Sequence, residues 1–245
     1  MVRIIGVLDL LGGRAVHARA GERDRYQPVR NVAGQPIEPG DALALAGAYL
    51  DRMSLSEIYA ADLDAILGRK PQDPLIARLA ALGAPLWLDA GVASQDRAAQ
   101  ALALGASHVV VGLETLPSWD TLRDISGALG RERVAFSLDL RDGRPIIASD
   151  SIPGEPADRI AARASDAGVG SVIVIDLSRV GTSRGLDLGL IARVRDALPG
   201  VTLVAGGGVR GPEDLRRLAD AGCDAALVAT ALQDGWLSAA SPGSG

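Results

Sequence analysis

Eight short apolar segments alternate with amphipathic stretches along the chain, and this alternation limits the possible folds more than any other feature of the sequence. Apolar runs of this length predict strands that are buried on both faces of a parallel sheet. The predicted strands are Arg3–Leu10, Glu57–Asp62, Leu86–Asp89, His108–Val111, Arg133–Asp139, Ser171–Asp176, Thr202–Ala205 and Ala225–Val228.

The stretches between these strands predict helices, because their apolar residues recur at three- and four-residue spacing. The helices expected from this spacing are Asp73–Leu82, Gln95–Leu104, Ala157–Ala167, Leu188–Ala197 and Pro212–Ala221. Eight strand–helix units in 245 residues predict an α/β fold of the (β/α)8 TIM barrel type. A doubly wound sheet is the alternative, although it usually has fewer strands at this length. We expect one barrel domain over residues 1–235 and a flexible tail over residues 236–245.

The chain also repeats itself, which favours a barrel built from two half-barrels. Three pairs of segments match in the same order: Leu86–Leu116 with Leu203–Gln233, Leu8–Arg14 with Leu138–Arg144, and Ala61–Leu63 with Ile175–Leu177. The first four predicted strands therefore resemble the last four.

Composition and charge exclude several classes of protein. Hydrophobic residues make up 48% of the chain, the net charge is −5, and the acidic balance is dispersed. This balance argues against nucleic-acid and membrane-surface partners, and no apolar run reaches the ~18 residues of a membrane span. The N-terminus lacks a signal-peptide pattern, and a single cysteine excludes an intramolecular disulfide, so we expect a reducing cytoplasm. We expect neither a metal nor a cofactor, and the sequence predicts no oligomeric state.

Carboxylates end several predicted strands, at the side of a TIM barrel where active sites lie. Asp9 and Asp139 end the first and fifth strands and would face each other across the barrel. Such a pair can act as general base and general acid, and we add Asp176, at the end of the sixth strand, as a third candidate. The alternative for each aspartate is that it caps a helix or binds loop amides.

Glycine-rich turns in each half predict two phosphate sites on opposite sides of the barrel mouth. Glycine lets backbone amides approach an anion, and a following helix adds a favourable dipole. The candidate phosphate-binding residues are Gly91 and Gly112 in one half, and Gly207, Gly208, Ala229 and Thr230 in the other. Either turn taken alone also fits an ordinary tight turn.

Five motifs between Ile5 and Leu232 carry a resemblance to a known family: VLDLLGGRAVHARAG, ADLDA, SLDLRDG, IDLSRVGT and VAGGGVRGPEDL. The chain resembles the ProFAR isomerase family of histidine biosynthesis (HisA) and its synthase relative HisF. The resemblance implies a duplicated half-barrel and two phosphate sites for a bisphosphorylated ribosyl substrate. It also implies an Amadori rearrangement of an aminoaldose to an aminoketose. Asp9 would be the general base, Asp139 a carboxylate of the site, and Thr182 a ligand-side residue.

Three departures from the family pattern affect the expected reaction. The family motif Asp-Gly-Thr, whose Asp is the expected general acid, is Val180-Gly181-Thr182 here. The substrate-contacting arginine after the first strand is matched by His17, and Arg144–Ile152 lacks the aromatic residue that stacks on the substrate. We therefore expect weak turnover of ProFAR itself.

The segment VHARAGERDRYQPV is similar to a branch of HisA-related paralogues in methanogens and methylotrophs. Its His17 and Arg19 are candidates for binding an anionic ligand, and a solvated basic loop is the alternative.

Three functions remain open at this point. The first is an aminoaldose–ketose isomerase acting on a phosphorylated ribosyl compound. The second is a related enzyme of a one-carbon or cofactor pathway with a smaller or singly phosphorylated substrate, including a Schiff-base lyase that would use Lys70, the only lysine. The third is a ligand-binding barrel without catalysis.

Overall fold

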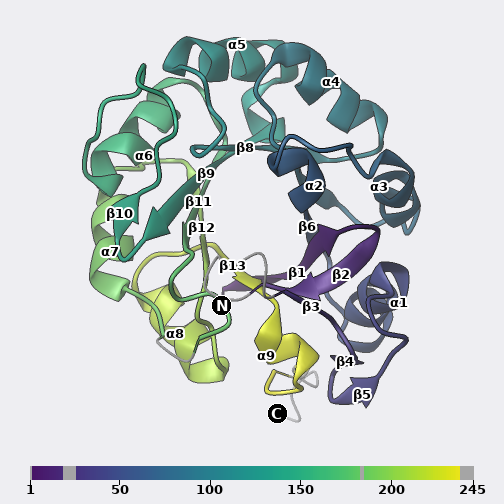
Figure 1. The fold of residues 1–245 in the computed structure, drawn as a ribbon. Helices are drawn as coiled ribbons and strands as arrows, with labels where there is room; N and C mark the ends of the chain where they lie inside the picture. Colours follow the sequence, from purple (N-terminus) through teal and green to yellow (C-terminus); the bar gives the residue numbers. More distant parts are fainter. Residues whose placement is uncertain (1, 19–25, 183–184, 238–245) are drawn as a thin grey trace.

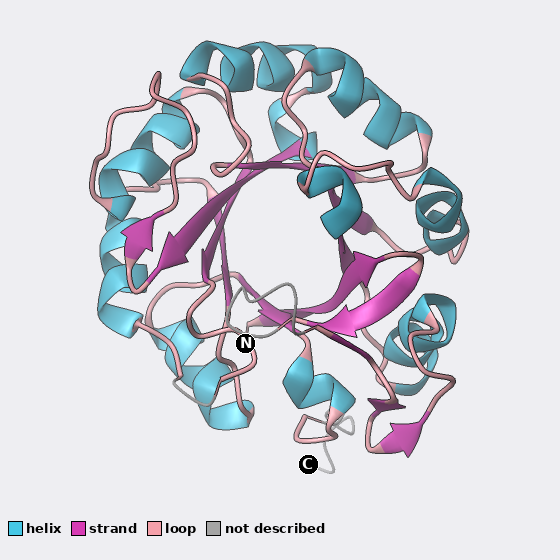
Figure 2. Ribbon diagram, in the orientation of Figure 1, coloured by secondary structure: helices cyan, strands magenta, loops and turns pink. Residues whose placement is uncertain are grey.

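The chain forms a closed barrel of parallel strands (Figures 1 and 2). The computed structural model describes residues 2–18, 26–182 and 185–237. The eight barrel strands are β1 (Arg3–Leu11), β6 (Ile58–Asp62), β7 (Leu86–Asp89), β8 (His108–Gly112), β9 (Val134–Arg141), β11 (Ser171–Asp176), β12 (Thr202–Gly206) and β13 (Ala225–Val228). Each pairs in parallel with the next, and β13 pairs with β1. This closure confirms the TIM barrel and excludes the doubly wound sheet, which is open.

An outer ring of helices surrounds the barrel (Figure 2). The longer helices are α3 (Asp73–Ala80), α4 (Gln95–Ala103), α5 (Trp119–Leu129), α6 (Ala157–Asp166), α7 (Leu188–Asp196) and α8 (Pro212–Asp220). All but α5 lie where the spacing of apolar residues predicts them, each one or two residues shorter than expected. The helix α5 was not predicted, although Ser118 provides an N-cap by accepting a hydrogen bond from the Thr121 N–H.

Shorter elements decorate the ends of the barrel. The helical ones are α1 (Ala42–Gly47), which continues as a π-helix over Ala48–Arg52, α2 (Leu63–Ile66), the 3-10 turn Arg131–Arg133 and α9 (Thr230–Gln233). The extended ones are β2 (Arg14–His17), β3 (Gln27–Pro28), β4 (Asn31–Val32), β5 (Gln35–Pro36) and β10 (Arg144–Pro145). None of them was predicted as a separate element. The most important for the site is α2, because it follows β6 directly at the barrel mouth.

The alternation of side chains along the strands creates two separate cores. On β1, Leu8 and Leu10 pack outward against the helices, whereas Ile5 and Val7 belong to the cluster inside the barrel. The inner cluster also contains Trp87 at the N-terminal end of the barrel. The next residue of β1 in the inward series is Asp9, which places a carboxylate above an apolar interior.

The N-terminal end of the barrel is filled by a stacked pair of rings. Trp87 and His108 lie parallel with ring centroids 4.0 Å apart, and the Trp87 Nε1–H donates to Glu57 Oε2 at 2.7 Å. Burial is the main reason that the pKa of His108 lies below its ordinary value. This packing leaves the opposite end, where the strands terminate, as the place for a site.

The last described residues pack against the barrel. Leu237 is only 3% exposed, and its N–H donates to the Ala231 carbonyl at 2.9 Å. The rest of the predicted tail, residues 238–245, lies outside the described residues, and the single-domain boundary at residue 235 stays a prediction. None of the described helices is long and apolar enough to cross a membrane.

Candidate active site

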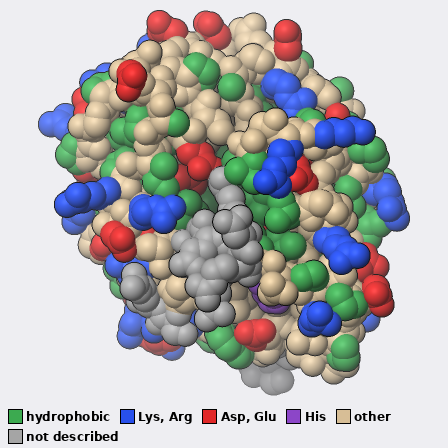
Figure 3. All heavy atoms as spheres, in the orientation of Figure 1, with side chains coloured by type: hydrophobic (Ala, Val, Ile, Leu, Met, Phe, Trp, Pro, Cys, Tyr) green, Lys and Arg blue, Asp and Glu red, His purple; other side chains and the backbone are tan. Residues whose placement is uncertain are grey.

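A pocket with a volume of about 250 Å³ opens at the C-terminal ends of the barrel strands. Figure 3 shows acidic side chains within the central hollow and Lys or Arg side chains around its rim. The wall is mixed in character, since aliphatic side chains such as Val7, Ile175 and Leu227 line it together with the carboxylates of Asp9 and Asp139.

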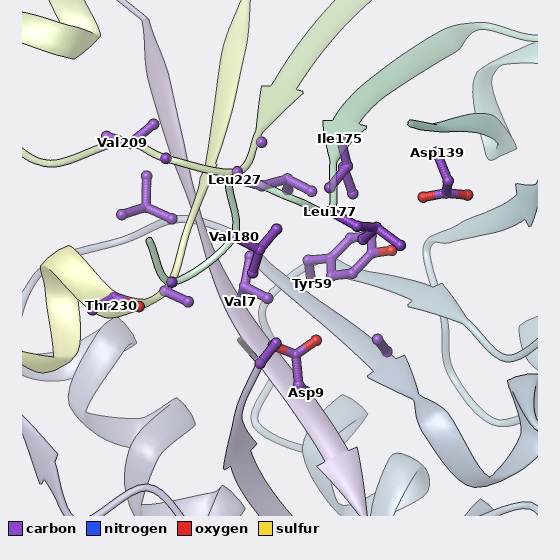
Figure 4. Close-up of a pocket in the computed structure, with 18 of the residues that line it drawn as sticks. Val7, Asp9, Tyr59, Asp139, Ile175, Leu177, Val180, Val209, Leu227 and Thr230 are labelled. Carbon is purple, nitrogen blue, oxygen red and sulfur yellow. The ribbon is translucent and has the colours of Figure 1, made fainter. Parts of the chain in front are cut away.

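Asp9 and Asp139 reach this pocket from strands that stand opposite each other. Three barrel strands separate β1 from β9 in either direction around the ring. Figure 4 shows both carboxylates extending into the pocket from different sides. Asp139 is 7% exposed, and its Oδ1 accepts a hydrogen bond from the Ser137 hydroxyl at 3.1 Å. The structure thus brings together the two carboxylates that the repeat singled out.

Two further side chains line the pocket: Asp89, one of the carboxylates that end predicted strands, and Tyr59, which was not predicted as a site residue. Tyr59 donates its hydroxyl proton to Asp89 Oδ2 at 3.2 Å. Burial, followed by the charges of Asp89, Asp139 and Asp9, raises the pKa of Tyr59 well above its ordinary value. The phenol therefore stays protonated at neutral pH and acts as a fixed hydrogen-bond donor. Tyr59 and Asp89 occupy positions on adjacent strands whose side chains point into the barrel, and counting alternate residues along each strand would have identified both.

Asp176 has a different environment from Asp9 and Asp139. Its carboxylate accepts hydrogen bonds from the N–H groups of Asp142 and Gly143 at 3.2 and 3.0 Å, and from the Ser178 hydroxyl at 2.6 Å. Burial raises the pKa of Asp176, but these hydrogen bonds outweigh it and hold the pKa below its ordinary value. Asp176 is not among the described residues that line the pocket. Its geometry is that of the loop-binding alternative, so we do not retain it as a candidate acid.

The predicted phosphate site of the second half lines the pocket. Gly207, Gly208, Ala229 and Thr230 all contribute to its wall at the ends of β12 and β13. Gly208 has a φ of +105°, and a Cβ there would lie 2.7 Å from the Gly185 carbonyl oxygen, so only glycine fits.

The predicted phosphate site of the first half differs. Neither Gly91 nor Gly112 is among the described residues that line the pocket. The Gly91 N–H donates to Asp89 Oδ1 at 3.3 Å, and the Gly112 carbonyl accepts from the Thr115 N–H at 3.1 Å. The two halves are therefore alike in sequence and unlike in the access that they give to a ligand.

The remaining residues that the sequence singled out lie in different places. Thr182 and Val180 line the pocket, and Figure 4 shows the Val180 side chain near its centre. His17 is half-buried on β2 beside the pocket, and burial lowers its pKa although Asp234 opposes the shift. Arg19 lies outside the described residues. Lys70 is exposed and is not among the described residues of the pocket wall.

Two aromatic side chains lie at the mouth. Tyr26 belongs to the segment after the first strand that was expected to cover the mouth, whereas Trp236 was not predicted. Trp236, which is 53% exposed, and Tyr26 both line the pocket. The family pattern led us to look for an aromatic residue between Arg144 and Ile152, whereas Trp236 comes from the segment after α9. Among the described residues, no three His, Cys, Asp or Glu side chains group closely enough to hold a metal ion.

Comparison with known proteins agrees with this architecture. The model of the histidine biosynthesis protein family matches residues 3–238. An isomerase of a bis-phosphoribosyl imidazole-4-carboxamide (ProFAR isomerase) from Thermus thermophilus is 34% identical over 237 residues, which are 96% of this chain and 95% of that protein. The corresponding isomerase of Deinococcus radiodurans is 30% identical over 238 residues, with the same coverage.

The similarity is not limited to named isomerases. An uncharacterised protein of Methanocaldococcus jannaschii is 31% identical over 238 residues, again 96% of this chain and 95% of that protein. Since the family model and these relatives cover nearly the whole barrel, the chain belongs to the histidine biosynthesis protein family of HisA-type TIM barrels.

Proposed function

We propose that this protein isomerises a phosphorylated aminoaldose to the corresponding aminoketose. The observation that carries the proposal is the entry of Asp9 and Asp139 into one pocket from opposite strands, beside the glycine turn of β12. The isomerase names of the relatives from Thermus thermophilus and Deinococcus radiodurans support the same reaction class.

The reaction needs an acid to open the sugar ring and a base to remove the hydrogen on carbon two. In our proposal, Asp139 protonates the ring oxygen, which leaves an iminium group at carbon one. Asp9 then takes the carbon-two proton to give an enaminol. Asp9 returns this proton to carbon one, and the carbon-two hydroxyl gives its proton to the Asp139 carboxylate as the ketone forms. The substrate gains protons at the ring oxygen and carbon one and loses them from carbon two and its hydroxyl, so the reaction is redox-neutral, regenerates both carboxyl groups and consumes no co-reactant. Each transfer of this kind commonly contributes ~10²–10⁴ in rate.

We also expect ProFAR to be a poor substrate. Val180 stands where the family has its expected acid, and an aliphatic side chain transfers no proton. Asp139 is the carboxylate left to replace it, so we expect ProFAR turnover well below the family level. A related reaction on another phosphorylated compound is the second candidate, favoured by Val180 and by the similarity to the uncharacterised Methanocaldococcus protein.

A paired assay tests this proposal. The purified chain and its Asp9→Asn variant are compared for ring opening and isomerisation of phosphorylated aminoaldoses, with Asp124→Asn as the control because Asp124 is exposed on α5. We expect Asp9→Asn to lose about a hundredfold or more in kcat and the control to lose nothing. Full activity of Asp9→Asn would show that the base lies elsewhere, and no activity on any such compound would favour a binding barrel without catalysis.

Complementation separates the first candidate from the others. Expression in a histidine auxotroph that lacks the isomerase should not restore growth if Val180 has removed the family reaction. Restored growth would make ProFAR isomerisation the physiological activity.

A further inference from the structure

We propose that Trp236 is a specificity-determining residue of the pocket, and that its indole ring binds a planar conjugated group of the ligand by stacking. This inference rests on the proposed function only in placing a phosphorylated ligand in the pocket. It goes beyond that function because Asp9 and Asp139 act on the reacting carbons, whereas Trp236 selects a group that the ligand carries elsewhere.

The backbone on each side of Trp236 is fixed against the body of the protein. The Leu237 N–H donates to the Ala231 carbonyl at 2.9 Å, and the Leu237 side chain is buried. Gly235 has a φ of +77°, and a Cβ there would lie 3.1 Å from the Gly34 nitrogen, so glycine lets the two segments pack closely at this point. Trp236 therefore lies between two anchored neighbours, and its backbone is in place before any ligand binds.

The helix before Trp236, α9, is also anchored. The Gln233 carbonyl at its end accepts from the N–H of Gly34 at 3.3 Å, in the turn between β4 and β5. The Gln233 side chain is buried, and its Nε2 donates to the Tyr49 hydroxyl at 3.2 Å. The same helix begins at Thr230, which lines the pocket in the predicted phosphate site. The backbone of Trp236 is thus fixed relative to that site, and a contact that is positioned in advance costs less entropy on binding.

The Trp236 side chain is exposed within the pocket, at 53%. The other two tryptophans differ, because Trp87 is buried in the barrel and the Trp119 ring lies 5.8 Å from the Phe136 ring. The buried side chain that holds the segment after α9 is Leu237, so the Trp236 ring is not needed to hold this segment in place. An exposed apolar ring in a pocket wall is a surface for a ligand.

The chemistry of the wall indicates which group this ring binds. Tyr59 also lines the pocket but is only 4% exposed, so little of its ring is accessible. Aliphatic side chains such as Ile175 and Leu227 bind apolar groups of any shape, whereas the flat face of an indole favours another π system. The ligand therefore carries a heteroaromatic ring or a conjugated amide against Trp236, in addition to a phosphate at the ends of β12 and β13.

Calorimetric titration of the full chain with two probes tests this inference. 5-Aminoimidazole-4-carboxamide ribonucleotide carries a planar heterocycle at carbon one, and ribose 5-phosphate does not. We expect the ribonucleotide to bind more tightly by about tenfold (~1.4 kcal/mol) or more, because its ring stacks on Trp236. Equal affinities would overturn the inference and leave the proposed function intact. Absence of binding by both probes would overturn the proposed function and, with it, this inference.

Three variants test whether the indole causes this preference. Trp236→Ala should weaken binding of the ribonucleotide by about tenfold and change binding of ribose 5-phosphate by less than about threefold. Trp236→Phe, which keeps a smaller aromatic face, should retain part of the preference. Leu82→Ala is the control and should bind both probes as the parent does, because Leu82 is an exposed apolar residue outside the described pocket wall.

Urea unfolding of each variant establishes that the proteins compared are folded. A preference for the ribonucleotide that survives Trp236→Ala, or an equal loss of affinity for both probes in that variant, would contradict the assignment of Trp236.

Discussion

Asp176→Ala distinguishes a structural carboxylate from a catalytic one. In the folded chain, Asp176 accepts hydrogen bonds from the N–H groups of Asp142, Gly143 and Ser178 and from the Ser178 hydroxyl, and it pairs with Arg179 at 3.4 Å. A hydrogen bond to a charged acceptor contributes ~1.5–3 kcal/mol, and the contributions in one cluster are not additive. We therefore expect the variant to lower the free energy of unfolding by about 2–4 kcal/mol.

The same carboxylate predicts a pH dependence of stability. The pKa of Asp176 is lower in the folded state than its ordinary value of 3.8, because the hydrogen bonds outweigh the effect of burial. Its contribution is therefore complete above the unfolded pKa and disappears as the pH falls through the lowered folded pKa. The difference in unfolding free energy between the parent and Asp176→Ala should be constant near neutrality and should shrink in acid.

Urea denaturation combined with steady-state kinetics measures both effects in one preparation. A structural Asp176 predicts a lower midpoint of unfolding with kcat within about threefold of the parent, measured where both proteins are folded. A loss of ~10² or more in kcat without a loss of stability would refute this reasoning and restore Asp176 as an acid or base.

Three further predictions concern the pocket. Val180→Asp should raise ProFAR turnover by about tenfold or more, since it restores a proton donor in the pocket wall. An unchanged rate in a steady-state assay with ProFAR would show that the missing acid does not limit turnover. Binding of ribose 5-phosphate should change the fluorescence of Trp236, because this side chain lines the pocket and is 53% exposed, whereas Trp87 is 1% exposed. Trp236→Phe should remove the change, and a change that persists in this variant would place the ligand elsewhere. Inorganic phosphate at ~100 times its Kd should stabilise the folded chain by about 2.7 kcal/mol, and thermal unfolding that is insensitive to phosphate would argue against the site at Gly207 and Gly208.

Much of the barrel could be predicted because its strands and helices have strong local signals. Apolar runs located every barrel strand. The predicted ends match those of β7, β11 and β13, and the other strands differ by one or two residues because strand ends depend on pairing with neighbouring strands. The helix α5 was missed although Leu122 and Ile125 are buried at helical spacing. The short elements at the mouth, such as α2 with four residues, have too few residues to show a period.

Side-chain parity explains which predicted carboxylates reach the pocket. In the parallel ladder Asp9 lies beside Ala61, and Leu10 lies beside Asp62, so Asp62 shares the outward face with Leu10. Asp139 lies beside Ile175 in the other half, and Asp176 lies beside Leu140. The repeat therefore contains one inward pair and one outward pair of aspartates. The internal repeat does not distinguish the two pairs. Counting alternate residues from Ile5 or Ala135, which point into the barrel, identifies Asp9 and Asp139 as the inward pair.

The glycine content of the two turns predicts that the second half holds the better phosphate site, because Ala90 replaces a glycine in the first half. Gly91 and Gly208 occupy equivalent places in the repeat, and both adopt positive φ values. Backbone atoms pack closely on both turns, those of Ile66 on Gly91 and those of Gly185 on Gly208, but only Gly208 is among the described residues that line the pocket.

The most direct test of the account is a crystal structure with an aminoalditol monophosphate, an analogue of the substrate reduced at carbon one. We predict a phosphate at the N–H groups of Gly207 and Gly208, with carbon two about 3 Å from an Asp9 oxygen and the former ring oxygen within hydrogen-bond distance of Asp139. A phosphate seated at Gly91, or reacting carbons that contact neither carboxylate, would contradict it.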